Sequence, residues 1–171
     1  MKAIVYTSNT GNTERYAKML GHQINLPVYP LDDAKKVLER ETPIIYFGWI
    51  MASGIKGYKE AEKRFCIRMV CAVGMGATGT QVDEIRNKNQ IPSSMEVFTL
   101  QGGFDMEKLR GINKLMMSMV VKTAGKALAE KKDRTPEEDD MLDLMMNGGS
   151  RVSMENLSEA IEWYERKRDL I

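Results

Sequence analysis

A short polar loop follows the first apolar segment of the chain. Residues 2–6 are mostly aliphatic and predict a buried strand, and a helix is expected over residues 13–23 with Asn12 or Thr13 as its cap. Between these elements lie hydroxyl, amide and glycine residues: Ser8, Asn9, Thr10, Gly11, Asn12 and Thr13. Because N–H groups at a helix start carry partial positive charge, such a loop can wrap an anion.

The chemistry of this loop indicates a terminal monophosphate ester. It contains no lysine, so it is not a triphosphate loop of the GxxxxGKS or GxxxxGKT type, which also serves Mg²⁺. It also lacks the GxGxxG spacing that cradles a pyrophosphate. The alternative interpretation is an ordinary turn and helix cap that holds no ligand.

Strands and helices alternate along the chain as far as residue 100. Apolar runs at 44–48, 68–74 and 95–100 predict buried strands, and residues 25–30 predict an edge strand that contains two prolines. Helices are expected in between, at residues 33–39, 56–65 and 81–87. The pattern predicts an α/β fold with a doubly wound, five-stranded parallel sheet of order 2-1-3-4-5. Ligands of such sheets bind beyond the carboxyl ends of the strands.

A helical segment at about 105–149 interrupts this alternation and is expected to contain two helices and no strand. Asp105 is the predicted cap of the first helix, whose apolar stripe comprises Leu109, Ile112, Leu115, Met116, Met119 and Val120. Thr135 and Pro136 begin the second with a capping box. A final helix at 153–167 directs one face toward the sheet, with Met154, Leu157, Ile161 and Tyr164. We therefore expect residues 1–171 to form a single domain with a helical insertion.

The polar loop resembles the phosphate loop of flavodoxins, whose pattern is Ser/Thr-x-Thr-Gly-x-Thr. Ser8 to Thr13 matches every fixed position. The resemblance implies that flavin mononucleotide (FMN) is the cofactor and that the hydroxyls of Ser8, Thr10 and Thr13 bind its phosphate with the amides of residues 9–13. It places the ring between two further loops, namely Trp49, Ile50, Met51, Ala52, Ser53 and Gly54, and Gly74, Met75, Gly76 and Gly79. Trp49 has the alternative interpretation of a core residue.

A narrower resemblance extends into the second half of the chain. Gly102 to Leu109, with the methionine-rich helix after it, is similar to the flavodoxin-like group that includes the quinone-dependent protoporphyrinogen dehydrogenases. The sequence departs from that group in having no basic loop for porphyrin carboxylates. Core packing is an alternative interpretation of the methionines.

Two functional classes follow from these resemblances. The chain is either an electron carrier for a redox partner protein or an oxidoreductase whose helical segment covers the flavin and admits a small organic or quinone substrate. Flavodoxin carriers are strongly acidic, and a formal net charge of +1 favours the enzyme. A phosphate-receiving switch is disfavoured because no acidic residues follow the first strand and no aspartate follows the third.

Composition leads to predictions about cellular location, partners and metal binding. No apolar run is long enough to cross a bilayer, and the start of the chain does not resemble a signal peptide, so we expect a cytoplasmic protein with no integral membrane segment. Scattered lysines and arginines argue against nucleic acid as a partner. Cys66 and Cys71 fit no metal or redox spacing, so no metal is expected. A homodimer is possible.

Overall fold

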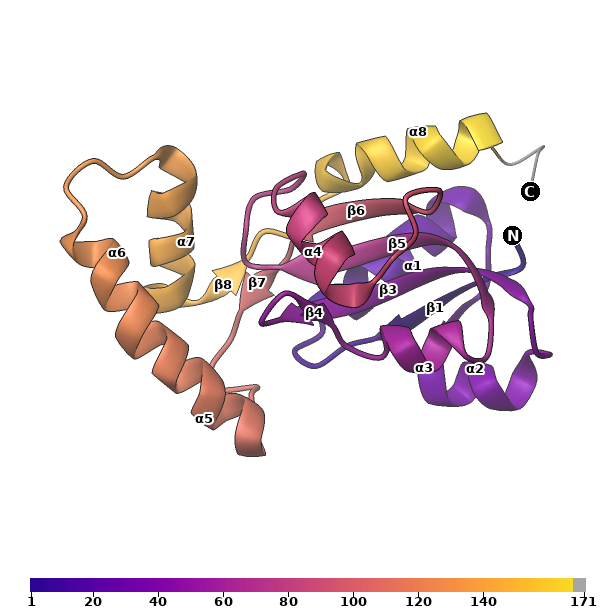
Figure 1. Cartoon of the computed structure of the whole chain (residues 1–171), viewed down its shortest axis with the longest axis horizontal. Helices are drawn as coiled ribbons and strands as arrows, with labels where there is room; N and C mark the ends of the chain where they lie inside the picture. Colours follow the sequence, from indigo (N-terminus) through magenta and orange to yellow (C-terminus); the bar gives the residue numbers. More distant parts are fainter. Residues whose placement is uncertain (168–171) are drawn as a thin grey trace.

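The computed structural model describes residues 1–167 and is built on a parallel sheet (Figure 1). The strand order is β2-β1-β3-β5-β6, and all neighbours on this path are parallel. A short β4 adds an antiparallel pairing to β3. The bounds are β1 Ala3–Thr7, β2 Val28–Pro30, β3 Pro43–Met51, β4 Gly54–Ile55, β5 Cys66–Gly74 and β6 Glu96–Gln101.

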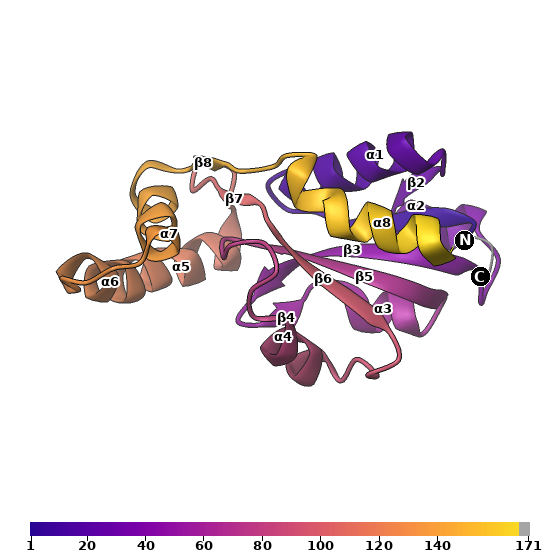
Figure 2. The same cartoon turned by 90° about the horizontal axis from the view of Figure 1, so that it is seen from above.

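Helices cover both faces of this sheet (Figure 2). Alternate strand residues point to opposite faces, so Ile4 and Ile45 pack under one set of helices while Val5 and Tyr46 pack under the other. The first face is covered by α1 Asn12–Ile24 and α8 Ser158–Lys167. The second is covered by α2 Leu31–Val37, α3 Tyr58–Glu62 and α4 Val82–Asn89.

This arrangement confirms the predicted doubly wound α/β fold, which is consistent with a flavodoxin-like sheet. Counting only the five parallel strands, their order is the predicted 2-1-3-4-5. One prediction was wrong: residues 49–51 belong to β3, and the chain then turns back as β4, so this segment is a hairpin where a loop was expected. The register pairs Ile50 with Ile55, which lets both apolar side chains remain in contact with the core.

The helical segment lies beyond the carboxyl ends of the strands, at the left of Figure 1. It has its own small core of Phe104, Leu109 and Leu144. The expectation of no strand was wrong, because the two ends of the segment pair with each other as an antiparallel ribbon. Its elements are β7 Gly103–Phe104, α5 Gly111–Val120, a π-helical turn η1 Val121–Gly125, α6 Lys126–Glu130, α7 Pro136–Asn147 and β8 Gly149–Ser150.

Of the two N-caps predicted for the helices of this segment, one is confirmed and one is not. The capping box at Thr135 is confirmed, since Thr135 Oγ1 accepts from the Glu138 amide and the Glu138 carboxylate accepts from the Thr135 amide. Asp105 accepts from the amides of Glu107 and Lys108, so it caps a turn that precedes α5 and not α5 itself.

The closing helix begins with a 3-10 turn, η2 Glu155–Leu157, and continues as α8. Leu157 is buried against the sheet, and Ile161 and Tyr164 are partly buried there, as predicted. Met154 was predicted to dock as well, but it is 43% exposed because it precedes the turn that brings the chain onto the sheet.

A buried tyrosine joins the end of β1 to the β3–β4 hairpin. Tyr46 donates to the carbonyl of Lys56 over 2.7 Å, and the Thr7 hydroxyl donates to Tyr46 Oη over 2.8 Å. Burial raises the pKa of Tyr46, so its phenol stays protonated and able to donate. Gly57 permits this packing, because a Cβ there would lie 2.2 Å from Tyr46 Oη and 2.3 Å from Thr7 Oγ1.

Tyr46→Phe should therefore destabilise the protein. The substitution leaves the Lys56 carbonyl and the Thr7 hydroxyl without their partner, which costs roughly 1–3 kcal/mol in the free energy of unfolding. Urea unfolding followed by circular dichroism measures the change. Tyr29→Phe is the matched control, because the Tyr29 hydroxyl makes no hydrogen bond among the described residues. Equal losses in the two variants would contradict the role of Tyr46.

A candidate phosphate and ring-binding site

The polar loop runs from the end of β1 into α1, where its last residues begin the helix. Gly11 is the N-cap, with φ 95°, a left-handed conformation that glycine adopts without strain. Asn12 and Thr13 were predicted as caps, but they lie inside the helix, and no side chain accepts a hydrogen bond at this end. Within residues 1–167, no acceptor receives the first-turn amides of Asn12, Thr13 and Glu14.

The three hydroxyls of the predicted phosphate loop are also without partners. Ser8 Oγ is buried and makes no hydrogen bond in the described chain. No hydrogen bond involves the hydroxyls of Thr10 or Thr13 among the described residues either, although Thr13 is only 2% exposed. Buried polar groups normally have partners, and an unsatisfied one costs free energy. Three free hydroxyls next to an uncapped helix start fit the phosphate of FMN.

A cavity of about 520 Å³ opens beside the loop, between the sheet edge and α5. This volume is within the range of small-molecule sites. One wall contains Asn9, Thr10, Asn12 and Thr13, and another contains Trp49, Ile50, Met51 and Ala52 from the hairpin. Gly74, Met75 and Gly76 form a third wall at the end of β5. The structure therefore brings the three predicted segments together around one cavity.

Five of the predicted site residues do not line this cavity. Ser8 lies on a neighbouring cavity, and Gly11 forms the turn behind the helix start. Ser53 donates to the Glu84 carboxylate, and Gly54 pairs with Met51 in the hairpin. Gly79 donates its amide to the Thr99 carbonyl over 3.0 Å. These contacts give Ser53, Gly54 and Gly79 structural roles in the loops that carry the cavity wall.

The remaining wall consists of residues that sequence reasoning did not assign to a site. They come from β5, α4, the ribbon and the helical segment: Val73, Gln81, Gly103, Phe104, Asp105, Leu109, Met116, Met117, Met119, Val120 and Met141. The methionine-rich pattern was the available signal, but it does not distinguish a cavity wall from a core. Asp105 is the one charged residue among those that line the cavity.

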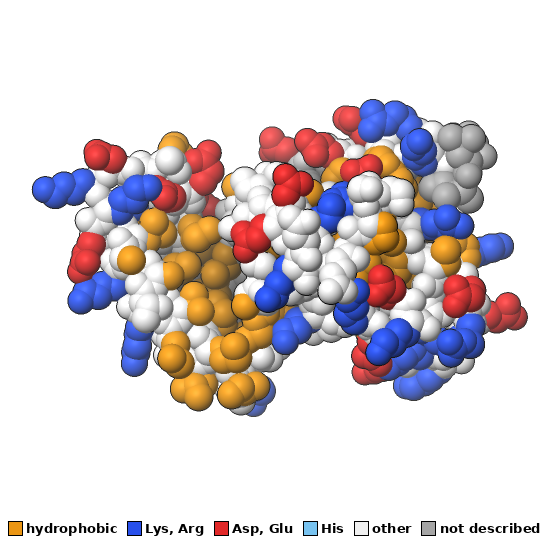
Figure 3. All heavy atoms as spheres, viewed as in Figure 1, with side chains coloured by type: hydrophobic (Ala, Val, Ile, Leu, Met, Phe, Trp, Pro, Cys, Tyr) orange, Lys and Arg blue, Asp and Glu red, His pale blue; other side chains and the backbone are white. Residues whose placement is uncertain are grey.

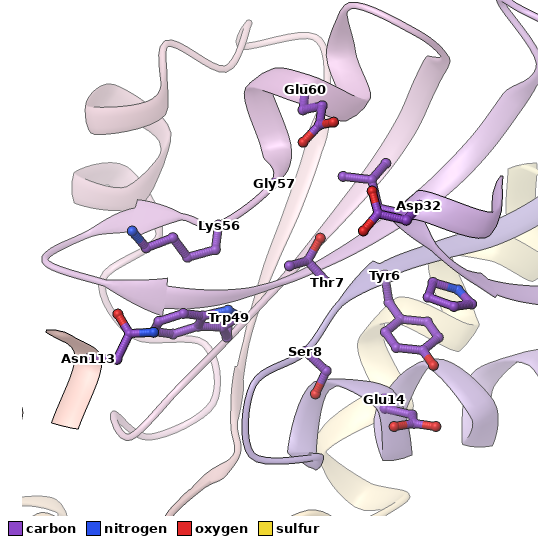
Figure 4. Close-up of a pocket in the computed structure, with 12 residues that line it drawn as sticks. Tyr6, Thr7, Ser8, Glu14, Asp32, Trp49, Lys56, Gly57, Glu60 and Asn113 are labelled. Atoms are coloured by element: carbon purple, nitrogen blue, oxygen red, sulfur yellow. The ribbon is translucent and has the colours of Figure 1, made fainter. Parts of the chain in front are cut away.

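A second cavity, of about 570 Å³, lies on the other side of the loop (Figure 4). Its lining includes the carboxylates of Glu14, Asp32 and Glu60. Glu14 pairs with Lys18 at 2.6 Å, and both other carboxylates pair with Lys35. Burial, and then the negative charge of Glu14, raise the pKa of Tyr6 in this cavity. Lys56 is the one cation in the same lining, so three carboxylates leave the lining net acidic and disfavour a phosphate dianion, and the first cavity is the better candidate.

Trp49 lies between the two cavities and lines both. It is half-buried, with the ammonium of Lys56 5.7 Å from its ring centroid, and Asn113 of α5 lies beside it in Figure 4. Of the two interpretations of Trp49, the cavity wall fits this position and the closed core does not.

The ribbon β7–β8 fixes the helical segment against the phosphate loop. Ser150 donates to Asn12 Oδ1 over 3.0 Å, so the far end of the segment touches the first turn of α1. Gln101 and Arg151 both donate to the Asp140 carboxylate, over 2.6 and 2.8 Å, which ties α7 to the end of β6. Movement of this segment is therefore coupled to the residues at the mouth of the cavity.

The hairpin turn is conformationally strained. Ala52 and Ser53 have φ of 47° and 61°, which two-residue hairpin turns require but which suits asparagine and glycine better. Residues held in such conformations cost free energy and cluster at functional sites. This turn lies at the cavity wall, on the segment that the flavodoxin resemblance assigns to the ring.

No protein-family model, no curated protein and no solved structure matches the chain in our comparisons. The relation to flavodoxins therefore rests on the sheet order and on the loop. Among the described residues, no helix is long and apolar enough to span a membrane.

Relief of the hairpin strain should stabilise the protein. Ala52→Asn places a residue that tolerates positive φ at an exposed position without touching the bond of Ser53, and we expect a gain of roughly 1 kcal/mol. In thermal unfolding this corresponds to a rise in Tm of about 2–4 °C.

The same substitution at an exposed position within a helix is the matched control. Ala127→Asn in α6 should lower stability by roughly 0.5 kcal/mol, because asparagine is a weaker helix former than alanine. A loss of stability in both variants would show that the turn is not strained.

Proposed function

We propose that the chain binds FMN with its phosphate at the loop from Ser8 to Thr13 and its ring in the cavity of about 520 Å³. The carrying observation is the set of unpartnered groups at the start of α1: Thr10 and Thr13 line this cavity with hydroxyls that make no hydrogen bond, and the first-turn amides have no acceptor within residues 1–167. The one charged residue of this lining, Asp105, is neutralised by an ion pair with Lys108 at 2.9 Å. The helix start supplies amide donors, which favour an anion.

The protein's part in such a site is to hold and shield the cofactor, while the flavin supplies one- or two-electron transfer. The hydroxyls of Thr10 and Thr13 fix the phosphate end. Trp49, the β3–β4 hairpin and the glycines at the end of β5 bound the ring. The strained turn keeps backbone groups close to the ring, where they favour one redox form over another.

Of the two functional classes, the oxidoreductase is better supported than the electron carrier. A carrier needs an exposed ring edge, but the cavity here is bounded by α5 and α7 through Met116, Met117 and Met141. Methionines adapt to apolar partners of varied shape, so this half of the cavity suits an organic substrate. Lysine and arginine are absent from its described lining, which favours a neutral acceptor such as a quinone over a porphyrin carboxylate.

Phosphate recognition makes a direct prediction about affinity. FMN should bind far more tightly than riboflavin, which lacks the phosphate, and more tightly than flavin adenine dinucleotide. Thr13→Ala should weaken FMN binding roughly ten- to a hundredfold, because a hydrogen bond to a charged group is worth about 1.5–3 kcal/mol. Quenching of flavin fluorescence during titration measures these affinities.

Ser8→Ala tests the unpartnered hydroxyl of the same loop in the protein without ligand. Removing a buried hydroxyl that has no partner should leave the Tm unchanged or raise it. Ser94→Ala, at an exposed position, should change neither quantity. Thr10→Ala with Thr13→Ala tests the same loop, and less than additive losses are expected for neighbours. Equal affinity for riboflavin and FMN would end the phosphate assignment.

A second prediction concerns the helical segment. Gly103 and Ser150 are opposite each other in the ribbon, so a short Gly-Ser linker of about two residues can join them and remove everything between. This variant keeps the loop and the Ser150 contact to Asn12, and it should still bind FMN. Its rates with quinones and dyes should change, because the methionine wall is gone.

Unchanged rates with every acceptor would contradict a lid function for the segment. A milder variant guards against loss of folding in the shortened chain. Met141→Trp enlarges a side chain on the cavity wall and leaves the ribbon intact, so it should lower the rate with large acceptors more than with small ones.

A further inference from the structure

One surface of the helical segment is apolar and uncovered. Helices α5, η1 and α6 run continuously from residue 111 to residue 130, and five large apolar side chains on the first part are between 38% and 67% exposed. These residues, which we call the apolar stripe, are Ile112, Leu115, Met116, Met119 and Val120. Figure 3 shows hydrophobic side chains gathered over this part of the molecule. A contiguous apolar patch of this kind marks an interaction site.

Packing within the segment does not account for the stripe. The side of the helix that faces α7 uses other residues, since Met117 and Val121 pack on Phe104, Leu109 and Leu144. The buried Gly125 lies where an added Cβ would be 3.7 Å from Met145 Sδ. Ile112 and Leu115 line neither cavity, so a ligand of the proposed flavin site does not cover them.

The charge around the stripe has one sign. Residues 108–129 contain five basic residues and no acidic residue: Lys108, Arg110, Lys114, Lys122 and Lys126. Lys108 pairs with Asp105, and Lys126 lies 3.8 Å from Glu130. Arg110, Lys114 and Lys122 form no ion pair within the part of the chain that the structure describes. Their charges are therefore available to an external anion.

We propose that the apolar stripe, together with the unpaired cations of the same segment, docks the protein on the surface of an anionic lipid bilayer. Apolar side chains on one side of a helix, with lysines and arginines around them, are the features of helices that lie in the membrane interface. The negative surface potential of anionic lipids attracts such cations. The docked helix lies on the membrane and does not cross it.

A second copy of the chain fits this surface less well. In a two-fold dimer the same patch meets itself, which would bring Arg110, Lys114 and Lys122 of both copies together. Most acidic residues of α7 are not available to the cations of a second copy, because Glu138, Asp139 and Asp140 already pair with Lys131, Arg134 and Arg151. A membrane supplies both an apolar layer and a diffuse negative charge.

Docking in this orientation has a consequence for the cavity beside the phosphate loop. Three residues of the exposed stripe, Met116, Met119 and Val120, also belong to the cavity wall. The mouth of the cavity therefore faces the bilayer, from which an apolar acceptor can enter. This last step rests on the proposed flavin function, whereas the docking itself does not.

Sedimentation of the full chain with lipid vesicles tests the proposal, with and without FMN. Vesicles of phosphatidylcholine mixed equally with phosphatidylglycerol should carry the protein down, and vesicles of phosphatidylcholine alone should carry down little. Binding should weaken as salt is raised. Equal binding to both vesicle types, or binding to neither, would overturn the proposal.

Two surface variants separate the apolar and electrostatic contributions. Ile112→Ser with Leu115→Ser should lower binding at least tenfold. Lys114→Glu with Lys122→Glu should lower it by a similar factor, since each basic residue near an anionic surface contributes roughly fivefold. Lys63→Glu with Lys88→Glu makes the same change in net charge at exposed positions outside the segment and should retain most of the binding.

FMN titration of the same variants distinguishes this proposal from the flavin assignment. None of the four substituted positions in the two stripe variants lines a cavity, so FMN affinity should be unchanged while vesicle binding falls. Failure of FMN binding in the unaltered chain would refute the flavin site and leave the docking result standing. Analytical ultracentrifugation tests whether the unaltered chain forms a dimer. If it does, and if the double variant Ile112→Ser with Leu115→Ser is a monomer, the stripe is a self-association surface and membrane docking is overturned.

Discussion

The carboxyl ends of the parallel strands meet at one edge of the sheet, and this constraint decides where every candidate functional residue lies. Because β1, β3 and β5 are neighbours and run in the same direction, the segments that follow them converge. The loop after β1 faces the hairpin after β3 and the glycines after β5 across one cavity. Chain segments that are well separated in the sequence thus line the same cavity.

The helical segment adds a wall at this edge of the sheet and leaves the order of the strands unchanged. Its ends pair as β7 and β8 directly after the last strand, so a stretch of more than forty residues adds a new wall without altering the sheet order. The contacts of Ser150 with Asn12 and of Asp140 with Gln101 make the wall part of the site. The same helices present apolar side chains both inward, at the cavity, and outward, at the solvent.

Two kinds of local energetic cost occur at this edge of the sheet. Ser8 Oγ is buried without a partner, and Ala52 and Ser53 hold positive φ. Both features lower the stability of the chain without a ligand, so interactions elsewhere in the fold must compensate for their free-energy cost. In the proposed function, a phosphate bound at this loop would accept hydrogen bonds from its unpartnered groups, which would link part of this cost to ligand binding.

Sequence alone determined the alternation of strands and helices and the capping box at Thr135, because each depends on residues close together in the chain. The strand order was predicted from the fold type that this alternation indicates, and the structure confirms it. Sequence alone did not determine the hairpin after β3 or the pairing of Gly103 with Ser150, since these depend on contacts between segments that no local pattern specifies. The methionines of α5 were ambiguous for the same reason. Helical spacing shows that Met116 and Met119 share a face, but only the packing of Met117 and Val121 on the small core decides that this face remains open to the cavity and to solvent.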